Sequence, residues 1–148
     1  MKRKILFYFT LIFAVSGMFL VYSCKDDDFG IRNDYEFSVA CLPVPKRLKN
    51  GETAEFRMEL VRSGSYSGTK YYVRYFQPDG KGTLTLDGLT LLPNDSYELK
   101  NESFRMYYTS QCDEQQAIDL TFYDNFKNRF ELSFTFSNDS KNDSKEED

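Results

Sequence analysis

The strongest constraint on the fold of this chain is the segment Tyr-Tyr-Val-Arg-Tyr-Phe at residues 71–76. It is dense in aromatic and β-branched residues, which fit a pleated, half-buried surface. Successive side chains of a strand point to opposite faces, so the segment has an inner and an outer set of residues: Tyr71, Val73 and Tyr75, and Tyr72, Arg74 and Phe76. Pro78 cannot donate to a ladder and Asp79-Gly80 is typical of a turn, so the strand ends there. We expect it to be a central strand of a β-sandwich.

Apolar and polar residues alternate with period two in several further segments on both sides of this strand. Their apolar members are Tyr35, Phe37, Val39 and Cys41; Phe56, Met58 and Leu60; Phe104, Met106 and Tyr108; Ile118, Leu120 and Phe122; and Phe130, Leu132, Phe134 and Phe136. Residues 84–91 predict a hairpin with a type I′ turn at Asp87-Gly88, in which all four leucines of the segment, including Leu89, share one face. Seven to eight short strands without an amphipathic helix predict an all-β fold, an immunoglobulin-like two-sheet antiparallel sandwich over residues 35–137. A small barrel is the alternative.

The first 24 residues predict export followed by attachment of a lipid. Residues 2–4 are positively charged and precede the apolar run 5–21, which is the pattern of a signal peptide over residues 1–23. Val21-Tyr22-Ser23-Cys24 resembles the bacterial lipoprotein box, in which the cysteine becomes the acylated first residue of the mature protein. We therefore expect lipidation at Cys24; an uncleaved anchor and plain secretion are the alternatives.

Residues 24–34 and 138–148 are predicted to be polar extensions of the sandwich. Lys25-Asp26-Asp27-Asp28 is expected to be part of a solvated tether, because its carboxylates repel one another. The same residues are similar to the acidic tag that sends some lipoproteins of Gram-negative gut anaerobes to the cell surface. The last eleven residues are polar and acidic without any apolar side chain, which predicts a disordered tail.

Composition and charge exclude several classes of function. A net charge of −4 and a pI near 5.0 argue against direct contact with nucleic acid. The chain has no histidine, and therefore lacks the usual general base and the commonest metal ligand. We expect no enzyme activity, no cofactor and no metal site. Carboxylates such as Asp79, Asp95 and Asp119 leave a hydrolase as the weakest hypothesis.

The outer residues of the strand at 71–76 are the candidates for an interaction surface. If the last two strands lie beside this strand, the surface comprises Tyr72, Arg74, Phe76, Tyr123 and Glu131, with Asp119 close by. Exposed aromatic residues together with arginine are concentrated at protein interfaces. The alternative is ordinary cross-strand packing with a surface ion pair that contributes little stability.

Cys41 and Cys112 are the two cysteines that remain after lipidation of Cys24. Export to an oxidising compartment allows a disulfide between them, and in an immunoglobulin-like strand order both positions fall at the same end of the sandwich. The alternative is two separate buried thiols that pack as small apolar side chains. A thiol protease would need a histidine partner, which the chain lacks.

Six stretches that cover nearly all of the predicted domain carry a resemblance to a known family. They are Leu42-Pro43-Val44-Pro45-Lys46; Gly51-Glu52-Thr53 leading into Arg57-Met58-Glu59-Leu60; Arg74-Tyr75-Phe76-Gln77-Pro78-Asp79-Gly80-Lys81-Gly82; Leu92-Pro93-Asn94-Asp95-Ser96-Tyr97; Phe104-Arg105-Met106-Tyr107-Tyr108-Thr109-Ser110; and Asp124-Asn125-Phe126. These stretches resemble the TraQ family of transfer proteins encoded on conjugative transposons of Bacteroides-type bacteria. The resemblance implies one immunoglobulin-like domain, a role in DNA transfer between cells, and no catalytic residues. Cys41, Cys112 and Lys127 depart from the family pattern, in which glycine is more usual at the last position.

We therefore expect a non-enzymatic envelope lipoprotein of a conjugative transposon transfer apparatus, which acts through contacts with other proteins of that apparatus. Its lipid is expected to hold it at the outer membrane, on the periplasmic or the surface face. The alternative is a cell-surface module that binds a glycan or another small ligand on a tyrosine platform, although the absence of tryptophan weakens this hypothesis. The oligomeric state stays open.

Overall fold

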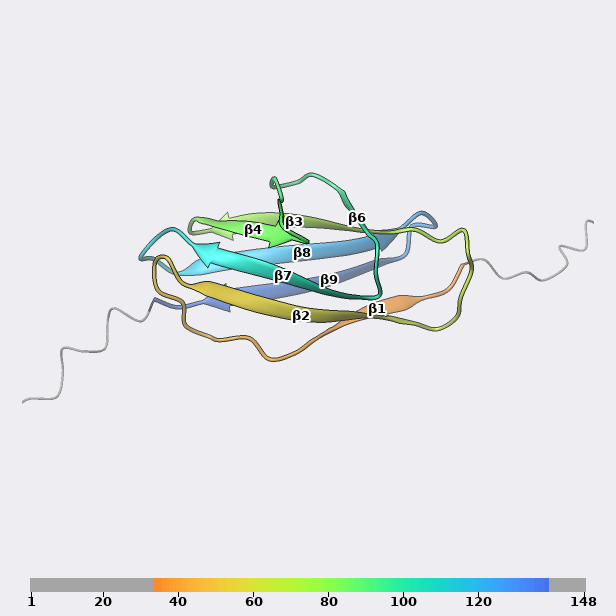
Figure 1. The fold of residues 1–148 in the computed structure, drawn as a ribbon, viewed down its shortest axis with the longest axis horizontal. Coiled ribbons are helices and arrows are strands. Elements are labelled where there is room, and N and C mark those ends of the chain that lie inside the picture. The colour runs from red at the N-terminus through yellow and green to blue at the C-terminus, as the bar shows by residue number, and fades with distance from the viewer. Residues whose placement is uncertain (1–33, 139–148) are drawn as a thin grey trace, which may run out of the picture. The chain divides into compact units, whose positions relative to one another are not determined.

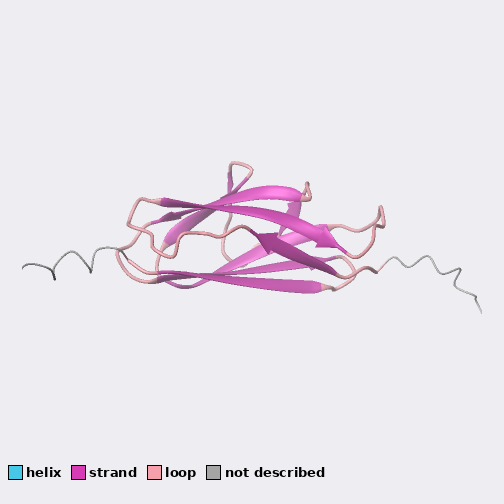
Figure 2. Ribbon diagram, turned by 90° about the horizontal axis from the view of Figure 1, so that it is seen from below, coloured by secondary structure: helices cyan, strands magenta, loops and turns pink. Residues whose placement is uncertain are grey.

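Because the strands alternate apolar and polar residues, each has one apolar face, and these faces meet between two antiparallel sheets (Figure 1, Figure 2). The computed structural model describes residues 34–138. The predicted signal peptide, Cys24 with its tether up to residue 33, and the tail beyond Asn138 lie outside the described residues. Residues 34–138 include no helix long and apolar enough to cross a membrane.

The two sheets have five and four strands and follow the immunoglobulin strand order. The five-stranded sheet, in the order β1-β2-β7-β4-β5, consists of β1 (Phe37–Cys41), β2 (Thr53–Arg62), β7 (Ser103–Ser110), β4 (Gly82–Leu86) and β5 (Leu89–Thr90). The four-stranded sheet, in the order β6-β3-β8-β9, consists of β6 (Tyr97–Leu99), β3 (Tyr71–Asp79), β8 (Gln116–Asp124) and β9 (Arg129–Phe136). The orders β1-β2-β7-β4 and β3-β8-β9 match the ABED and CFG sheets of a constant-type immunoglobulin domain. The predicted all-β sandwich is therefore confirmed.

β3, the strand that the sequence predicted to be central, lies between β6 and β8. Its inner residues Tyr71, Val73 and Tyr75 are buried, whereas Arg74 and Phe76 are exposed. The described part of the chain has nine strands where the sequence predicted seven to eight. The unpredicted strand is β6, which has three residues and is therefore too short to show a period-two pattern.

The β4–β5 hairpin has the predicted turn, but its four leucines are not equally buried. Asp87 and Gly88 both have positive φ (50° and 79°), as a type I′ turn requires, and Leu86 is paired with Leu89. Three leucines of the hairpin are buried, but Leu89 is 56% exposed. Leu89 is exposed because β5 is a two-residue strand at the sheet edge, where no further strand covers its side chain.

The core consists of aromatic and aliphatic side chains from both sheets. Phe56 of β2 packs against Phe134 and Phe136 of β9 with ring centroids 4.6 and 6.2 Å apart, and Tyr108 stacks on Phe136 at 5.7 Å. Leu48, in the segment between β1 and β2, is also buried, and its backbone N–H donates to the carbonyl of Ser137. This bond ties the segment to the end of β9, so the side of the sandwich between β1 and β9 is closed there.

The chain passes from one sheet to the other between β3 and β4, beneath the side chain of Tyr108. Gly80 has φ +76°, and a Cβ added to Gly82 would lie 2.2 Å from the ring of Tyr108. The Tyr108 hydroxyl lies 2.8 Å from the side-chain amides of both Gln77 and Gln116. With its amide oxygen toward Tyr108, Gln77 also accepts from the backbone N–H groups of Lys81 and Gly82, at 3.2 Å each. These contacts hold the end of β3, the start of β4 and the start of β8 in one place.

We predict that stability falls at alkaline pH because of Tyr108. Burial raises the pKa of Tyr108 to about 12 from 10.0, so the folded state holds its proton more tightly than the unfolded state. The contribution of this proton to the free energy of unfolding is fully present below pH 10 and is lost as the pH rises from 10 to about 12. Urea unfolding across this range should show a decline of about 1 kcal/mol per pH unit.

In Tyr108→Phe this alkaline decline should be weaker. The same variant should be less stable at neutral pH by about 1–3 kcal/mol, because Gln77 and Gln116 lose their partner. Tyr107→Phe, which alters an exposed residue of the same strand, serves as the matched control. An unchanged alkaline slope in Tyr108→Phe would contradict the assignment.

We predict that Lys127→Gly stabilises the protein. Lys127 has φ +77°, a left-handed conformation that strains any side chain with a Cβ. Glycine removes this strain, so the free energy of unfolding should rise by about 0.5–1 kcal/mol. The same replacement at exposed Lys81, which has no positive φ, should lower the stability instead. Equal effects at the two positions in urea unfolding would refute the strain at Lys127.

Candidate functional site

The five residues predicted to form an interaction surface gather on the outer face of the four-stranded sheet. We call this set the outer patch: Tyr72, Arg74 and Phe76 of β3, Tyr123 of β8 and Glu131 of β9. The register places Tyr72 directly opposite Tyr123. Arg74 of β3 and Glu131 of β9 are level with each other, on either side of Thr121 of β8. Of the last two strands, β8 lies directly beside β3 as the candidate surface required, whereas β9 lies one strand further away, beyond β8.

Tyr123 is the centre of the outer patch. Its ring stacks on Tyr72 with centroids 5.4 Å apart and an interplanar angle of 20°. The guanidinium carbon of Arg74 lies 5.5 Å from the centroid of the same ring, which is within cation–π range. The Tyr123 hydroxyl is also hydrogen-bonded to Ser96 in the loop before β6. The neighbouring strand β3 and this loop therefore hold Tyr123 in one position.

Arg74 makes no ion pair within residues 34–138, although the surface ion pair was the alternative to a binding role. Glu131 is paired with Arg129 of its own strand. Asp119 accepts a hydrogen bond from Ser133 at 2.6 Å. The Arg74 guanidinium thus rests on an aromatic ring while its N–H donors are not engaged by a carboxylate of the described chain, so they are available to a partner.

A shallow groove of about 360 Å³ crosses the outer patch. Its lining includes Arg74, Phe76, Asn94, Asp119 and Glu131, so it combines charged, amide and aromatic groups. Phe76 is 49% exposed, and it lies beyond the part of β3 that pairs with β6, so its strand has a paired neighbour there only in β8. The groove is open to solvent, so a bound partner could reach these groups directly.

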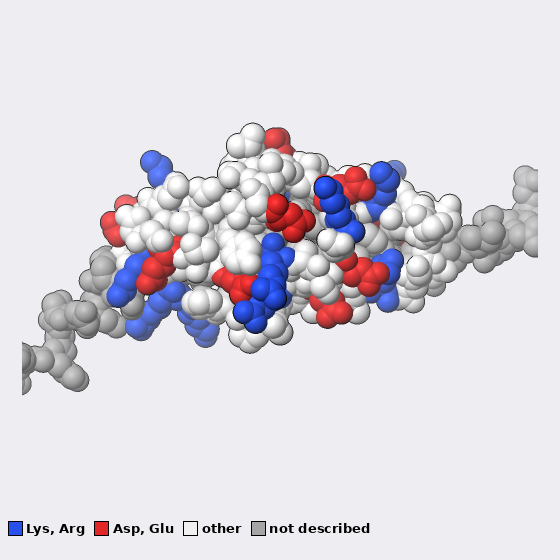
Figure 3. All heavy atoms as spheres, viewed as in Figure 1, with Lys and Arg blue, Asp and Glu red and all other residues white. Residues whose placement is uncertain are grey.

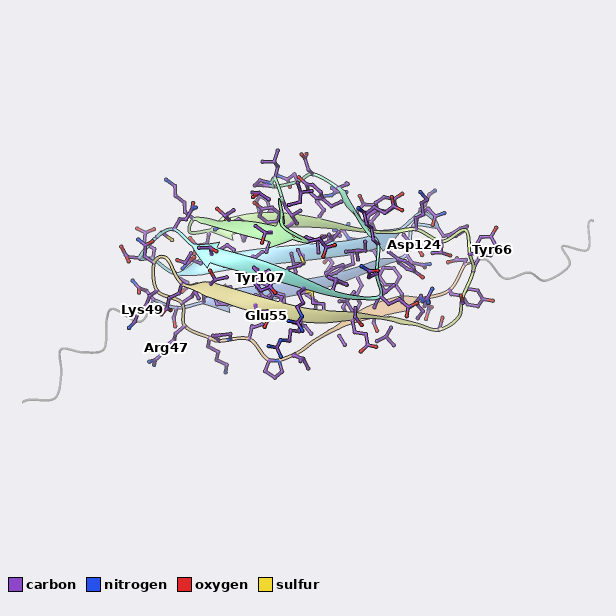
Figure 4. The ribbon with its side chains drawn as sticks, in the orientation of Figure 1. Arg47, Lys49, Glu55, Tyr66, Tyr107 and Asp124 are labelled. Atoms are coloured by element: carbon purple, nitrogen blue, oxygen red, sulfur yellow. The ribbon has the colours of Figure 1, made fainter. Side chains whose placement is uncertain are left out.

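The outer face of the five-stranded sheet carries a charged cluster that the sequence analysis did not identify. Glu55 is hydrogen-bonded to Arg57 at 2.7 Å, Arg105 at 3.1 Å and the Tyr107 hydroxyl at 3.3 Å (Figure 4). The hydrogen bond from Arg57 lowers the pKa of the Glu55 carboxyl, with the charges of both arginines acting in the same direction. Acidic and basic side chains lie side by side across this face (Figure 3), so its charges are largely compensated internally.

This cluster was missed because its members come from different strands. Period-two alternation places Glu55 and Arg57 on the outer side of β2, and Arg105 and Tyr107 on the outer side of β7. The register that pairs Glu55 with Tyr107 and Arg57 with Arg105 is a tertiary feature. No local signal in the sequence specifies it.

Cys41 and Cys112 are both free thiols, and each is half-buried, so they match the second alternative in being separate but not in being buried. The expectation that they lie at the same end was wrong. Cys41 is level with Met58 of β2 and, across β2, with Phe104 at the start of β7. Cys112 instead follows Ser110, the last residue of β7. The six residue-to-residue steps from Phe104 to Ser110 correspond to about 20 Å of strand, whereas a disulfide needs Cα atoms within about 7 Å. The Cys112 sulfur instead lies 3.1 Å from the backbone nitrogen of Lys81.

No group of three or more His, Cys, Asp and Glu side chains within residues 34–138 is arranged to hold a metal ion.

A family model described as TraQ conjugal transfer protein matches residues 5–139 of the chain. The similar solved structures include a conjugative transposon lipoprotein from Bacteroides eggerthii, which is 48% identical with a TM-score of 0.66; the match covers 70% of this chain and 98% of that one. A lipoprotein from Bacteroides thetaiotaomicron is 51% identical with a TM-score of 0.67, over 83% of this chain and 95% of that one. A conjugate transposon protein from Bacteroides vulgatus is 45% identical with a TM-score of 0.64, over 75% and 91% of the two chains. No curated protein matches the chain.

We predict that the two thiols of the sandwich stay reduced without any reductant. In the full chain carrying Cys24→Ser, Cys41 and Cys112 are the remaining cysteines, and both should react with a thiol reagent after unfolding. In the native protein Cys41 should react more slowly than after unfolding, because burial raises the pKa of its thiol and keeps the reactive thiolate scarce. A denatured protein without free thiols would refute this.

Proposed function

Because the chain belongs to the TraQ family of conjugal transfer proteins, we propose that it serves the transfer apparatus of a conjugative transposon as a lipid-anchored envelope protein. Cys24 is the residue proposed to carry the lipid, and its position at the end of the apolar run 5–21 supports this. Similar proteins from two Bacteroides species are described as lipoproteins. Each buried methylene of an acyl chain contributes about 0.8 kcal/mol, so several chains on one cysteine hold a domain firmly at a bilayer. The outer membrane is the proposed location.

The protein acts by contact with other proteins of the apparatus, and the outer patch is the contact surface. The observation that carries this proposal is the arrangement around Tyr123, where Arg74 lies on the ring without a carboxylate partner in the described chain. Tyrosine, phenylalanine and arginine are enriched at interfaces, and such residues dominate binding energy when a partner desolvates them. The partner is expected to bring a carboxylate to Arg74 and an apolar side chain to Phe76.

The outer patch is less suited to the alternative, a glycan platform. Sugars stack on the open faces of aromatic rings, but the Tyr123 ring already lies against Tyr72 and against Arg74. Phe76 remains open, and it offers a single ring without a hydroxyl. These contacts favour a protein partner over a carbohydrate.

We predict that Arg74→Ala combined with Phe76→Ser disrupts assembly with the partner. Residues of this type at the centre of an interface cost about 2 kcal/mol or more when truncated, so recovery of the complex and transfer frequency should both fall at least about tenfold. Pull-down from a mating-competent donor and counts of transconjugants measure the two effects.

The matched control changes the same residue types on the other sheet. Arg105→Ala combined with Leu89→Ser removes an exposed arginine and an exposed apolar side chain, while Glu55 keeps its bond to Arg57. Circular dichroism checks that both variants remain folded. The proposal fails if a folded Arg74/Phe76 variant assembles and transfers as well as the control.

A further inference from the structure

The described chain begins at one end of the sandwich, between the loop that joins β2 to β3 and the turn that joins β8 to β9. The Asn128 side-chain amide donates to the carboxylate of Asp34 and to the carbonyl of Tyr35. The backbone N–H of Ser63 donates to the carbonyl of Glu36 at 2.9 Å. We call this end, formed by residues 34–36, 63–70 and 124–129, the tethered end; Tyr66 and Asp124 mark it in Figure 4.

An aromatic pair lies at the surface of the tethered end. Tyr66 and Phe126 meet edge to face with ring centroids 6.0 Å apart, and Tyr66 is 36% exposed. Asn125 joins the two loops, because its oxygen accepts from the backbone N–H of Lys70 at 2.8 Å and its amide donates to the carbonyl of Gly68 at 3.0 Å. The Asp124 carboxylate accepts from the backbone N–H of Phe126 at 2.8 Å. The pair is thus presented by a rigid end rather than by a loose loop.

Basic side chains flank this pair. Lys127, next to Phe126, and Lys100, in the loop between β6 and β7, are exposed and make no ion pair within residues 34–138. Of the carboxylates at this end, Glu98 and Glu102 are paired with Lys70 and Arg62, and those of Asp34 and Asp124 accept from Asn128. Glu36 is also exposed at this end. A partly exposed tyrosine with neighbouring lysines is the combination that settles at the headgroup level of a bilayer.

We propose that the tethered end of the sandwich rests on the lipid surface, with Tyr66 and Phe126 at the level of the headgroups and Lys127 beside them. This rests on the proposed lipid anchor at Cys24. Residues 25–33 separate that cysteine from Asp34, and nine residues span at most about 30 Å. A lipid on Cys24 therefore confines the tethered end to the neighbourhood of the bilayer, where its high effective concentration lets a weak contact form.

Docking of the tethered end determines the orientation of the outer patch relative to the membrane. The strands run from the tethered end to the opposite end, and the nine residues of β8 span about 30 Å. The outer patch lies on the side of the sandwich formed by β3, β8 and β9, so it faces along the membrane rather than toward it. A partner anchored in the same membrane is therefore within lateral reach.

The absence of tryptophan from the chain allows a direct test. Tyr66→Trp places a single fluorophore at the tethered end, and Tyr107→Trp places one on the side of the sandwich at matched exposure, 36% against 38% for the native tyrosines. The full lipidated protein is reconstituted into vesicles of phosphatidylethanolamine and phosphatidylglycerol, with and without lipids brominated in the acyl chains. We expect Trp emission of the Tyr66→Trp protein to shift to the blue and lose intensity with brominated lipid, and that of Tyr107→Trp to change in neither respect.

Adding Lys127→Glu to Tyr66→Trp should reduce the quenching, because the anionic lipid repels the new carboxylate. Unquenched emission from a folded Tyr66→Trp protein that floats with the vesicles overturns the docking and leaves the lipid anchor intact. Equal quenching of both tryptophans overturns the orientation. A mature protein that does not float with vesicles overturns the anchor and the docking together.

Discussion

The fold depends on one close contact, between the ring of Tyr108 and the backbone of Gly82, where the chain changes from one sheet to the other. A side chain on Gly82 would occupy the space of that ring, so glycine alone allows the crossing to be this short. The Tyr108 hydroxyl bonds to Gln77 near the end of β3 and to Gln116 at the start of β8. A single buried side chain thus joins four strands, two from each sheet, and sets the position of the outer patch, which is carried by β3 and β8.

The two outer faces of the sandwich use the same residue types with opposite electrostatic results. On the five-stranded sheet, Arg57 and Arg105 share the carboxylate of Glu55, so each arginine has an ion-pair partner within the chain. On the four-stranded sheet, Arg74 rests on Tyr123 and lacks a carboxylate within the described chain. Exposed ion pairs contribute little to stability, so the difference matters for recognition. The arginines of one face share a carboxylate, whereas the other face presents a positioned arginine without one, beside an exposed phenylalanine.

The proposed anchor and the proposed contact surface are related through the geometry of the sandwich. Asp34, where the described chain begins, is bonded to the turn between β8 and β9, so the lipid acts on one end of the long axis. The outer patch lies on a side of the same axis. Residues with interfacial character, Tyr66 and Phe126, occur at the end that such an anchor holds near the bilayer. In this proposal the protein meets its partners laterally, at a distance from the bilayer that the length of its strands determines.

The amino-acid sequence alone determined several local features of this protein. Alternation assigned the inner and outer residues of β3, and Asp87-Gly88 dictated the hairpin turn, because both depend only on neighbouring residues. Period-two alternation also identified the residues of the outer patch as outward-facing. Tertiary structure decided the rest: that Leu89 lies uncovered at an edge, that Cys41 and Cys112 stand a strand length apart, and that Arg74 stacks on Tyr123 while Glu131 pairs with Arg129. These outcomes depend on the strand register and sheet edges, which bring together residues far apart in the chain and which no local pattern encodes.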